Sequence, residues 1–323
     1  MIDVRPYRGA DKALWNGFVA TAKNATFLFD RDFMDYHGDR FEDFSLMFFK
    51  ADKLIAVLPA HKSDQHLLSH NGLTYGGFVW GRKIKFIDAF EAFKSALAYL
   101  YKEGFSTLEI KEIPRIYHQL PCDESDYFMA LCGAELIKKE VLLVIDYQDH
   151  LPFEKNRRQG INRAIRHGLE VRVDANFKDF WETILVPQLK EKHQAAPVHS
   201  LAEIELLAQR FPNQIQQVSV YHQNKLVAGT TVFLTPTTVH PQYVMGNADK
   251  NALGSLDLAY DYIIETFKPG RRYFNFNSSS EDQGRLLNQG LLFWKETCGA
   301  RCITSSQYRI NTEAHKTLNL QFT

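Results

Sequence analysis

The sequence lacks an excess charge of either sign, and it is poor in cysteine. Its 38 basic and 38 acidic residues cancel, so no strong overall field steers it to DNA or to an anionic membrane. A local basic patch remains compatible with this balance. Four cysteines in 323 residues do not make a disulfide scaffold, and we expect reduced thiols in the cytoplasm.

Long apolar runs are missing as well. No run approaches the roughly 20 residues that a membrane-spanning helix needs, and the N-terminus has no signal-peptide pattern. Cys-x-x-Cys and His-Glu-x-x-His are absent, which argues against a metal site. Without Gly-x-Ser-x-Gly, a P-loop or Gly-x-Gly-x-x-Gly, the sequence also disfavours a serine hydrolase, a kinase and a Rossmann enzyme.

The residues that are present suit a globular protein of two domains. Hydrophobic residues make up 45% and aromatic residues 13% of the chain, and the length fits two domains of roughly 150 residues each. Pro152 disfavours helix at the residue before it, and a basic helix is predicted just after it. We therefore expect domains at residues 1–150 and 151–323.

The two halves show the same order of predicted elements. In each half, helices precede a strand hairpin, and a long helix then leads to a short strand. Residues 48–56 align with residues 220–228, each as an apolar strand, a polar turn ending in Lys and a second apolar strand,. This self-similarity favours a duplicated unit, although one matching hairpin also arises by chance. Hairpins beside a helix-linked crossover imply a mixed sheet with helices on its faces.

Three stretches resemble the Fem-like transferases. The basic run at residues 155–169 is similar to the helix before their second lobe, and Tyr75-Gly76-Gly77 is similar to a Gly-rich turn of their first lobe. Residues 273–280, followed by residues 293–299, resemble their closing strand and the segment after it. Over nearly the full length, the chain resembles bacterial acyltransferase-like proteins with two GNAT domains, which are related to the Fem peptidyltransferases.

The resemblance implies an α/β (α+β) fold of two tandem acyl-CoA N-acyltransferase (GNAT-like) domains, with a degenerate first lobe. It implies transfer of an acyl group from an activated donor, acyl-CoA or acetyl-CoA, to an amine such as an amino sugar or a cell-envelope precursor. The donor would lie between two splayed strands, with its pyrophosphate at a helix N-terminus. The alternatives are a Fem-like enzyme that uses aminoacyl-tRNA, and a non-catalytic module that binds a small molecule.

The expected pyrophosphate site departs from the GNAT pattern. Residues 247–255 contain a single glycine, Gly254, where GNAT enzymes carry a Gly-rich loop. Ser255 is a candidate N-cap, and free N–H groups in a first helical turn attract anions. Asp257 would oppose a phosphate there and would suit an amine. Arg158 and Arg163 of the basic helix are candidate diphosphate ligands, or they form an ordinary solvated face.

Polar residues gather at the ends of two predicted strands. Tyr243, Met245 and Asn247 alternate on one strand and therefore share a face. On the next strand the same alternation applies to three small polar residues, which are Asn275, Asn277 and Ser279. Buried amides need hydrogen-bond partners, so this pattern predicts a polar substrate pocket where the strands diverge. The alternative is a set of strand-end and turn residues.

Candidate catalytic groups surround this pocket. His193 and His199 lie in a predicted loop and are candidate proton acceptors, or incidental surface histidines. Ser200 and Glu203 form a capping-box pattern for the next helix. Lys295 would neutralise a substrate carboxylate, or it belongs to a solvated helix face.

Three further residues complete the predicted site. Glu281 is a candidate base for an amine, and Asn288 belongs to the same polar segment. The alternative is that this segment is a solvated helix face. The resemblance to simple GNAT enzymes gives Tyr308 the role of protonating a leaving thiol.

Overall fold

The protein is described by a computed structural model that covers residues 1–323, apart from the side chain of His193. It forms two compact units, Met1–Glu140 with Thr304–Thr323, and Val141–Ile303. We expected a division near residue 150 and a C-terminal half that stays whole. The boundary between the compact units lies within strand β9 (Glu135–Asp146), between Glu140 and Val141. Strand β17 (Arg301–Asn311) then returns the chain to the first unit.

The first unit contains mixed β-structure and four α-helices. Strands β1, β3, β4 and β7 form an antiparallel sheet. Strand β8 pairs antiparallel with β17 and parallel with β6, which continues through β5 to β2. The strands are β1 (Ile2–Pro6), β2 (Glu42–Asp43), β3 (Leu46–Lys50), β4 (Lys53–Leu58), β5 (His61–Ser63), β6 (His66–Leu68), β7 (Val79–Trp80) and β8 (Thr107–Lys111). The helices are α1 (Lys12–Val19), α2 (Arg31–Met34), α3 (Phe86–Lys102) and α4 (Glu124–Leu131).

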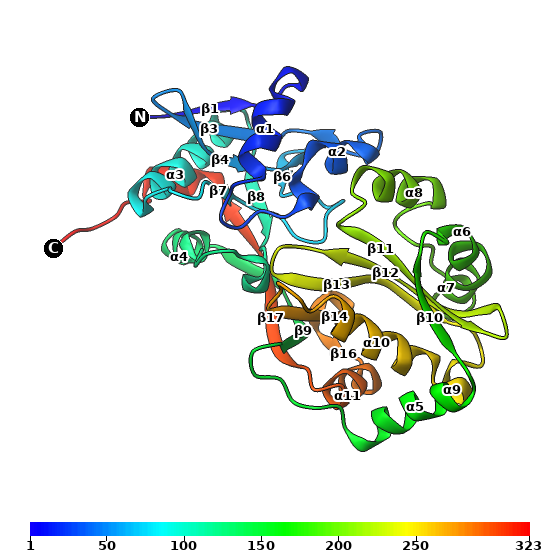
Figure 1. Cartoon of the computed structure of the whole chain (residues 1–323). Coiled ribbons are helices and arrows are strands. Elements are labelled where there is room, and N and C mark those ends of the chain that lie inside the picture. Colours follow the sequence, from blue (N-terminus) through cyan, green and yellow to red (C-terminus); the bar gives the residue numbers. More distant parts are fainter. The chain divides into compact units, whose positions relative to one another are not determined.

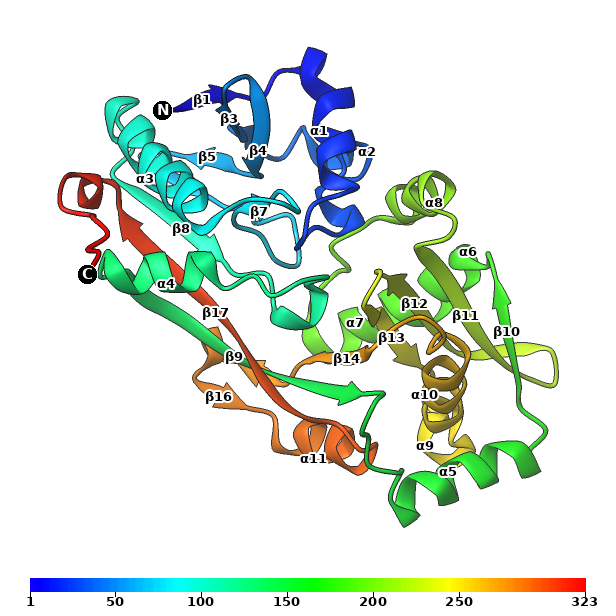
Figure 2. The same ribbon diagram turned by 60° about the vertical axis from the view of Figure 1, so that its left-hand side comes forward.

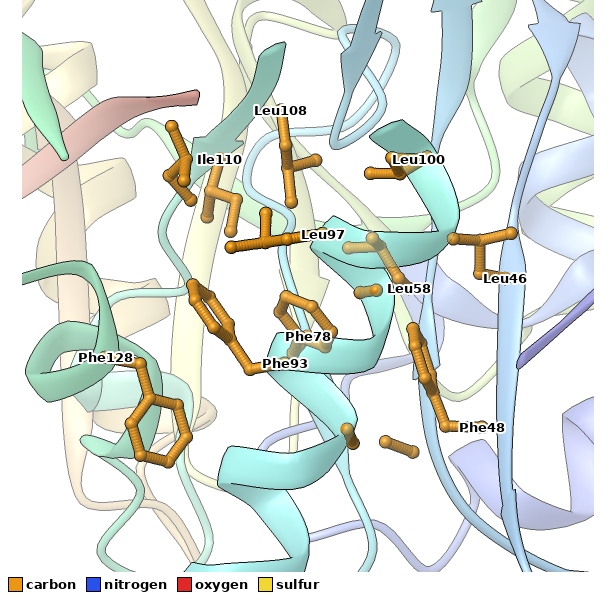
Figure 3. Packing of buried hydrophobic residues seen from close by; sticks show 14 of the residues in the cluster. Leu46, Phe48, Leu58, Phe78, Phe93, Leu97, Leu100, Leu108, Ile110 and Phe128 are labelled. Carbon is orange, nitrogen blue, oxygen red and sulfur yellow. The ribbon is translucent and has the colours of Figure 1, made fainter. Parts of the chain in front are cut away.

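Helix α3 supplies much of the apolar core of this unit. Its residues Phe93, Leu97 and Leu100 recur at helical spacing and are fully buried. They pack with strand residues such as Phe48 and Ile110 in one cluster (Figure 3). Each such side chain contributes about 1.5–3 kcal/mol by its burial, which is why the helix forms against these strands.

The second unit has one mixed sheet with the order β10-β11-β12-β13-β14-β9. Strands β13 and β14 pair in parallel, and the other neighbours pair antiparallel. Its further strands are β10 (Glu170–Asp174), β11 (Ile215–His222), β12 (Lys225–Leu234), β13 (Thr238–Gly246), β14 (Tyr273–Ser278), β15 (Ser280–Glu281) and β16 (Leu286–Leu287). The helices are α5 (Lys155–Arg166), α6 (Phe177–Asp179), a π-helical turn (Phe180–Leu185), α7 (Val186–His193), α8 (Leu201–Arg210), α9 (Lys250–Leu253), α10 (Ser255–Thr266) and α11 (Gln289–Thr297).

Helices cover both faces of this sheet. Helix α10 lies on one side of β11–β13, and α6, α7 and α8 lie on the other (Figures 1 and 2). Ile263 of α10 packs with Phe274 and Phe276 of β14 in a buried cluster. Since neighbours in a strand alternate between faces, Asn275 between these two rings points away from α10.

The two aligned hairpins have the same construction. In each, the two central turn residues have positive φ, at 46° and 60° in the first hairpin and 51° and 61° in the second. Two such residues are typical of a type I′ turn. The pairing register then shifts by one residue at the same distance from each turn, between Phe48 and Phe49 and between Val220 and Tyr221. A shared irregularity at matching positions supports duplication more strongly than the sequence alignment alone.

Candidate acyl-transfer site in the second unit

Strands β13 and β14 diverge soon after they meet. Their parallel pairing is limited to Thr238 with Tyr273 and Val239 with Phe274. Beyond this point β13 remains paired with β12 as far as Gly246, and β14 remains paired with β9 as far as Ser278. The predicted divergence of these two strands is therefore confirmed. Beyond it, their facing backbone groups form no β-sheet hydrogen bonds with each other.

Buried polar side chains line the start of this divergence. His240 is 3% exposed, and Asn275 is 2% exposed. The amide Nδ2 atoms of Asn275 and Asn277 lie 3.4 Å from Nδ1 and Nε2 of His240, and Oε1 of Gln242 lies 3.1 Å from Nε2. Burial lowers the pKa of His240 to about 4, so its imidazole is neutral near pH 7. The structure brings the two predicted amides together around a histidine that sequence reasoning missed.

Lys295 of α11 places a buried cation at the end of β14. Its side chain donates hydrogen bonds of 3.0 and 2.7 Å to the carbonyl oxygens of Asn277 and Ser278. The residue is 3% exposed, and burial lowers the pKa of its ammonium to about 7. The predicted solvated helix face does not hold for Lys295, which is one of the few lysines of the unit taken out of water.

Helix α11 is fixed in place at both its start and its middle. Asn288 is its N-cap, and the side-chain Oδ1 accepts a 2.9 Å hydrogen bond from the amide of Leu291. Trp294 packs against Tyr260 and Phe276, with ring centroids 4.8 and 5.9 Å apart. Because Lys295 follows Trp294 directly, this packing directs the next side chain to β14.

A second polar pair joins β13 to the loop before α8. The phenol oxygen of Tyr243 is 2.6 Å from Nδ1 of His199 and accepts a 3.1 Å hydrogen bond from the amide of the same residue. The indole of Trp181 donates to the carbonyl of His199 at 3.2 Å. Burial raises the pKa of Tyr243 to about 12, so the phenol keeps its proton and can share it with the imidazole.

The N-terminus of α10 is filled by other parts of the chain. Gly254, at a φ of 73°, is its N-cap, and the buried Ser255 is the first helical residue without a capping bond. The prediction of Ser255 as N-cap is therefore wrong, because the left-handed backbone at Gly254 already turns the chain. Nη1 of Arg157 lies 2.6 Å from Oδ1 of Asp257. At Gly160 a Cβ atom would overlap that carboxylate, and at Gly254 it would overlap the Gly160 carbonyl.

Comparison with solved structures finds proteins of a similar fold. No family model and no curated protein match the sequence. FemX is similar over 98% of this chain and 99% of its own, at 12% identity and a TM-score of 0.65. The C-terminal domain of a putative lysylphosphatidylglycerol synthetase from Agrobacterium fabrum is similar over 96% of this chain and 95% of its own, at 12% identity and a TM-score of 0.60.

A tandem GNAT protein from the clavulanic acid biosynthesis pathway is also similar. It matches 97% of this chain and 99% of its own at 13% identity, with a TM-score of 0.52. The chain has a GNAT-like, Fem-related fold. The predicted α/β fold class is thereby confirmed, and each of these likenesses extends over both units.

Within this Fem-related fold, the predicted diphosphate ligands lie beside α10. Arg158 is exposed on α5. Nη2 of Arg163 donates a 2.8 Å hydrogen bond to the carbonyl of Asn251, and its Nε has no partner. Asn247 closes the turn after β13, where its Oδ1 accepts from the amide of Asp249 at 3.0 Å.

The remaining predicted residues lie at the edge of the site or outside this unit. Glu281 is exposed and accepts a 2.9 Å hydrogen bond from Asn288. Ser279 is 2% exposed, and its Oγ has no partner. Tyr308 belongs to the first unit, where it lies opposite Ile110 on β8. The side chain of His193 lies outside the described part of the structure.

In the described part of the chain, no group of three or more His, Cys, Asp or Glu side chains has an arrangement that would hold a metal ion. Among the same residues, no helix is both long enough and apolar enough to pass through a lipid bilayer.

Proposed function

We propose that this protein is an N-acyltransferase whose reaction takes place where β13 and β14 diverge. The observation that carries the proposal is Lys295, a buried cation held by two carbonyl groups at the end of β14. A buried ammonium is costly to the fold, so its presence at the divergence favours a role in the reaction. The unpaired backbone of the two strands supplies further donors for a developing oxyanion.

The proposed reaction conserves atoms and charge. The amine nitrogen of the acceptor attacks the carbonyl carbon of the donor and forms a C–N bond. The bond from that carbon to the donor oxygen or sulfur then breaks, and the leaving atom takes up a proton as the amine loses one. Lys295, with a pKa of about 7, is matched to proton transfer near neutral pH. Two of its three N–H groups bind carbonyls, which leaves one for the substrate.

The polar pairs of the site receive binding roles in this proposal. Asn275 and Asn277, ordered by His240, bind the acyl donor. Tyr243 and His199 form the second pair, and we assign them contacts with the amine acceptor. An amino sugar or a cell-envelope precursor are acceptor classes that fit such polar contacts.

The geometry favours an aminoacyl ester of tRNA over acyl-CoA as the donor. Helix α5 and the carboxylate of Asp257 occupy the N-terminus of α10, where the resemblance would place a pyrophosphate. A carboxylate at this position also offsets the partial positive charge that attracts phosphate to a helix N-terminus. A donor carried by tRNA does not depend on this helix end. The occupied N-terminus of α10 therefore favours the Fem-like alternative.

Transfer assays test both parts of the proposal. Labelled aminoacyl-tRNA and acetyl-CoA are each offered to the protein with a panel of primary amines, and amide formation is measured. We expect transfer from aminoacyl-tRNA, a loss of at least a hundredfold in Lys295→Met, and little change in Lys225→Met, which removes an exposed lysine of the β11–β12 hairpin. Transfer from acetyl-CoA alone would overturn the donor assignment, and full activity of Lys295→Met would overturn the site.

A further inference from the structure

A cavity of about 420 Å³ lies in the second unit, on the face of the sheet opposite α10. Val218 of β11 belongs to the same buried cluster as Ile263 of α10, so the neighbouring side chain of Gln217 points to the other face. Strands β10 and β11 and helices α6 and α8, which lie together in both views, enclose the cavity there (Figures 1 and 2). Much of its wall is apolar and is formed by Phe177, Ala208, Pro212 and Ile215.

Asp174, at the end of β10, places a carboxylate in this wall. Its Oδ1 accepts hydrogen bonds from Oγ of Ser219 at 2.9 Å and from the amide of Asn176 at 3.1 Å. Its Oδ2 accepts one from the phenol of Tyr221 at 3.0 Å. All three donors are neutral, and Oδ2 has room for a second donor. The carboxylate is therefore held in a fixed orientation with one acceptor position left.

No cation neutralises this carboxylate directly. Among the described side chains, no Lys, Arg or His forms an ion pair with Asp174. Arg172 lies two residues earlier on the same face of β10, but it pairs with Glu170 at 2.6 Å. A carboxylate with a free acceptor position and no bound cation favours a positively charged ligand.

Gln217 supplies a hydrogen-bond donor beside Asp174. The two residues are directly opposite each other in the β10–β11 ladder, which places their Cβ atoms about 5 Å apart. Gln217 is 1% exposed, and its Oε1 accepts a 2.8 Å hydrogen bond from Thr231. Its Nε2 carries two protons, and its one contact is with the carbonyl of Val218 at 3.4 Å. At least one N–H of this buried amide is therefore open to an acceptor in the cavity.

The lining of this cavity fits a small organic cation. Glu205 of α8 adds a second carboxylate, and the residues that line the cavity include no Lys, Arg or His. Apolar walls with a few fixed polar groups are typical of small-molecule sites. We propose that this cavity binds a small organic ammonium ion that carries a hydroxyl or carbonyl oxygen on the adjacent carbon. The ammonium donates to Oδ2 of Asp174, and the oxygen accepts from Nε2 of Gln217. The apolar remainder of the ligand packs on Phe177 and Ile215.

This site is separate from the divergence of β13 and β14. Asp174, Gln217, Thr231 and Tyr243 occupy neighbouring positions on the four successive strands β10 to β13. Three strand spacings of about 4.8 Å put Asp174 about 14 Å from Tyr243. A small ligand on Asp174 does not span this distance, so the inference goes beyond the proposed function and does not depend on it.

Binding of trans-2-aminocyclohexanol to the full chain tests the site, because this probe has an ammonium and a hydroxyl group on adjacent carbons of an apolar ring. Saturation-transfer NMR titrations give its dissociation constant, which we expect to be about 1 mM for so small a ligand. Cyclohexane-1,2-diol has a similar shape without the charge. It should bind roughly tenfold more weakly, since hydrogen bonds to charged groups are the stronger ones.

Two variants close the site in different ways. Ala208→Phe fills the cavity from α8, and Asp174→Asn removes the charge. Each should weaken binding of the amine roughly tenfold or more. The matched control is Ala202→Phe, the same change at an exposed position of α8, which should bind the probe like the wild type. Circular dichroism shows whether each variant folds, and if one does not, the other decides.

Three outcomes overturn the inference. They are no binding by the wild type, equal affinity for the amine and the diol, and wild-type affinity in the folded Ala208→Phe or Asp174→Asn variant. Lys295→Met and Tyr243→Phe separate this site from the proposed reaction site, and both should keep the wild-type affinity for the probe. A loss in either would place the probe at the reaction site and refute the second site. If Lys295→Met keeps transfer, the proposed reaction site fails while the ammonium site stands.

Discussion

Replacing Lys295 by Met should make the protein less dependent on pH for its stability. The ammonium has a pKa of about 7 in the folded protein, against 10.5 in the unfolded chain. Below pH 7 both states carry the charge, and the folded state bears the whole cost of burying it. Between pH 7 and 10.5 the unfolded chain binds more protons, so the stability of the wild type rises with pH in this window.

The size of the effect follows from these two values. Linkage gives a rise of about 3 kcal/mol in the free energy of unfolding between pH 6 and pH 9 from this group. The Met variant lacks the titrating group, so its difference from the wild type should change by that amount. At pH 9, where the amine is neutral, the variant also loses the hydrogen bonds to Asn277 and Ser278, at about 0.5–1.5 kcal/mol for each bond.

Urea unfolding at pH 6 and pH 9 measures the difference. Every other titrating group contributes equally to wild type and variant and cancels when their curves are subtracted. Lys225→Met, at an exposed hairpin position, controls for the loss of one positive charge. Curves for the wild type and Lys295→Met that stay parallel from pH 6 to pH 9 would show that the ammonium is not buried, and the argument for its catalytic role would fail with it.

Three further changes have defined outcomes. Burial raises the pKa of Glu112 to about 7, so the wild type should lose about 2 kcal/mol of stability between pH 5 and pH 8, where the folded state binds the extra proton; urea unfolding of Glu112→Gln should lack this loss, and an equal loss would contradict the assignment. Gly160→Ala should lower the melting temperature, because its Cβ meets the Asp257 carboxylate and overpacking costs about 1–3 kcal/mol. Gly17→Ala in α1 has open space and should raise the melting temperature slightly; equal shifts would show that α5 is not packed on α10. Tyr243→Phe removes the bond to His199 and should cost about 1 kcal/mol while raising the KM for the acceptor more than it lowers kcat; a fall in kcat alone would contradict an acceptor-binding role.

Periodicity in the sequence predicted most elements, because their signals are local. The sequence pattern predicts a helix over residues 201–210 and a strand over residues 107–111, and α8 and β8 form with these bounds. The Ser200–Glu203 capping box is present. The sequence pattern over residues 177–192 also predicts one continuous helix, but a π-helical turn at Phe180–Leu185 interrupts it. That turn lies where Phe180 packs on the backbone of Gly229, a contact that the local pattern does not contain.

The parts of the site that sequence reasoning missed depend on distant segments. Asn275 and Asn277 were predicted from their alternation along β14. Their partner His240 lies on β13, which pairs with β14 at only two positions. The contact of Gly160 with Asp257 joins residues far apart in the sequence. Neither the strand register nor this helix contact has a signature in a single sequence.

The first unit differs from the second in the polar face of one strand. Strand β8 corresponds in order to β14, and both alternate apolar and polar residues, with Leu108 and Ile110 in the core. Where β14 carries Asn275 next to His240, the polar face of β8 carries Glu109, which pairs with Arg309 of β17 at 2.9 Å. A carboxylate already bound to an arginine is not free to bind an acyl donor. We infer that in this unit the polar face of β8 is used for its ion pair with β17. Glu109→Asn should therefore disturb packing against β17 without adding activity. Transfer by a Lys295→Met, Glu109→Asn double variant would refute this view.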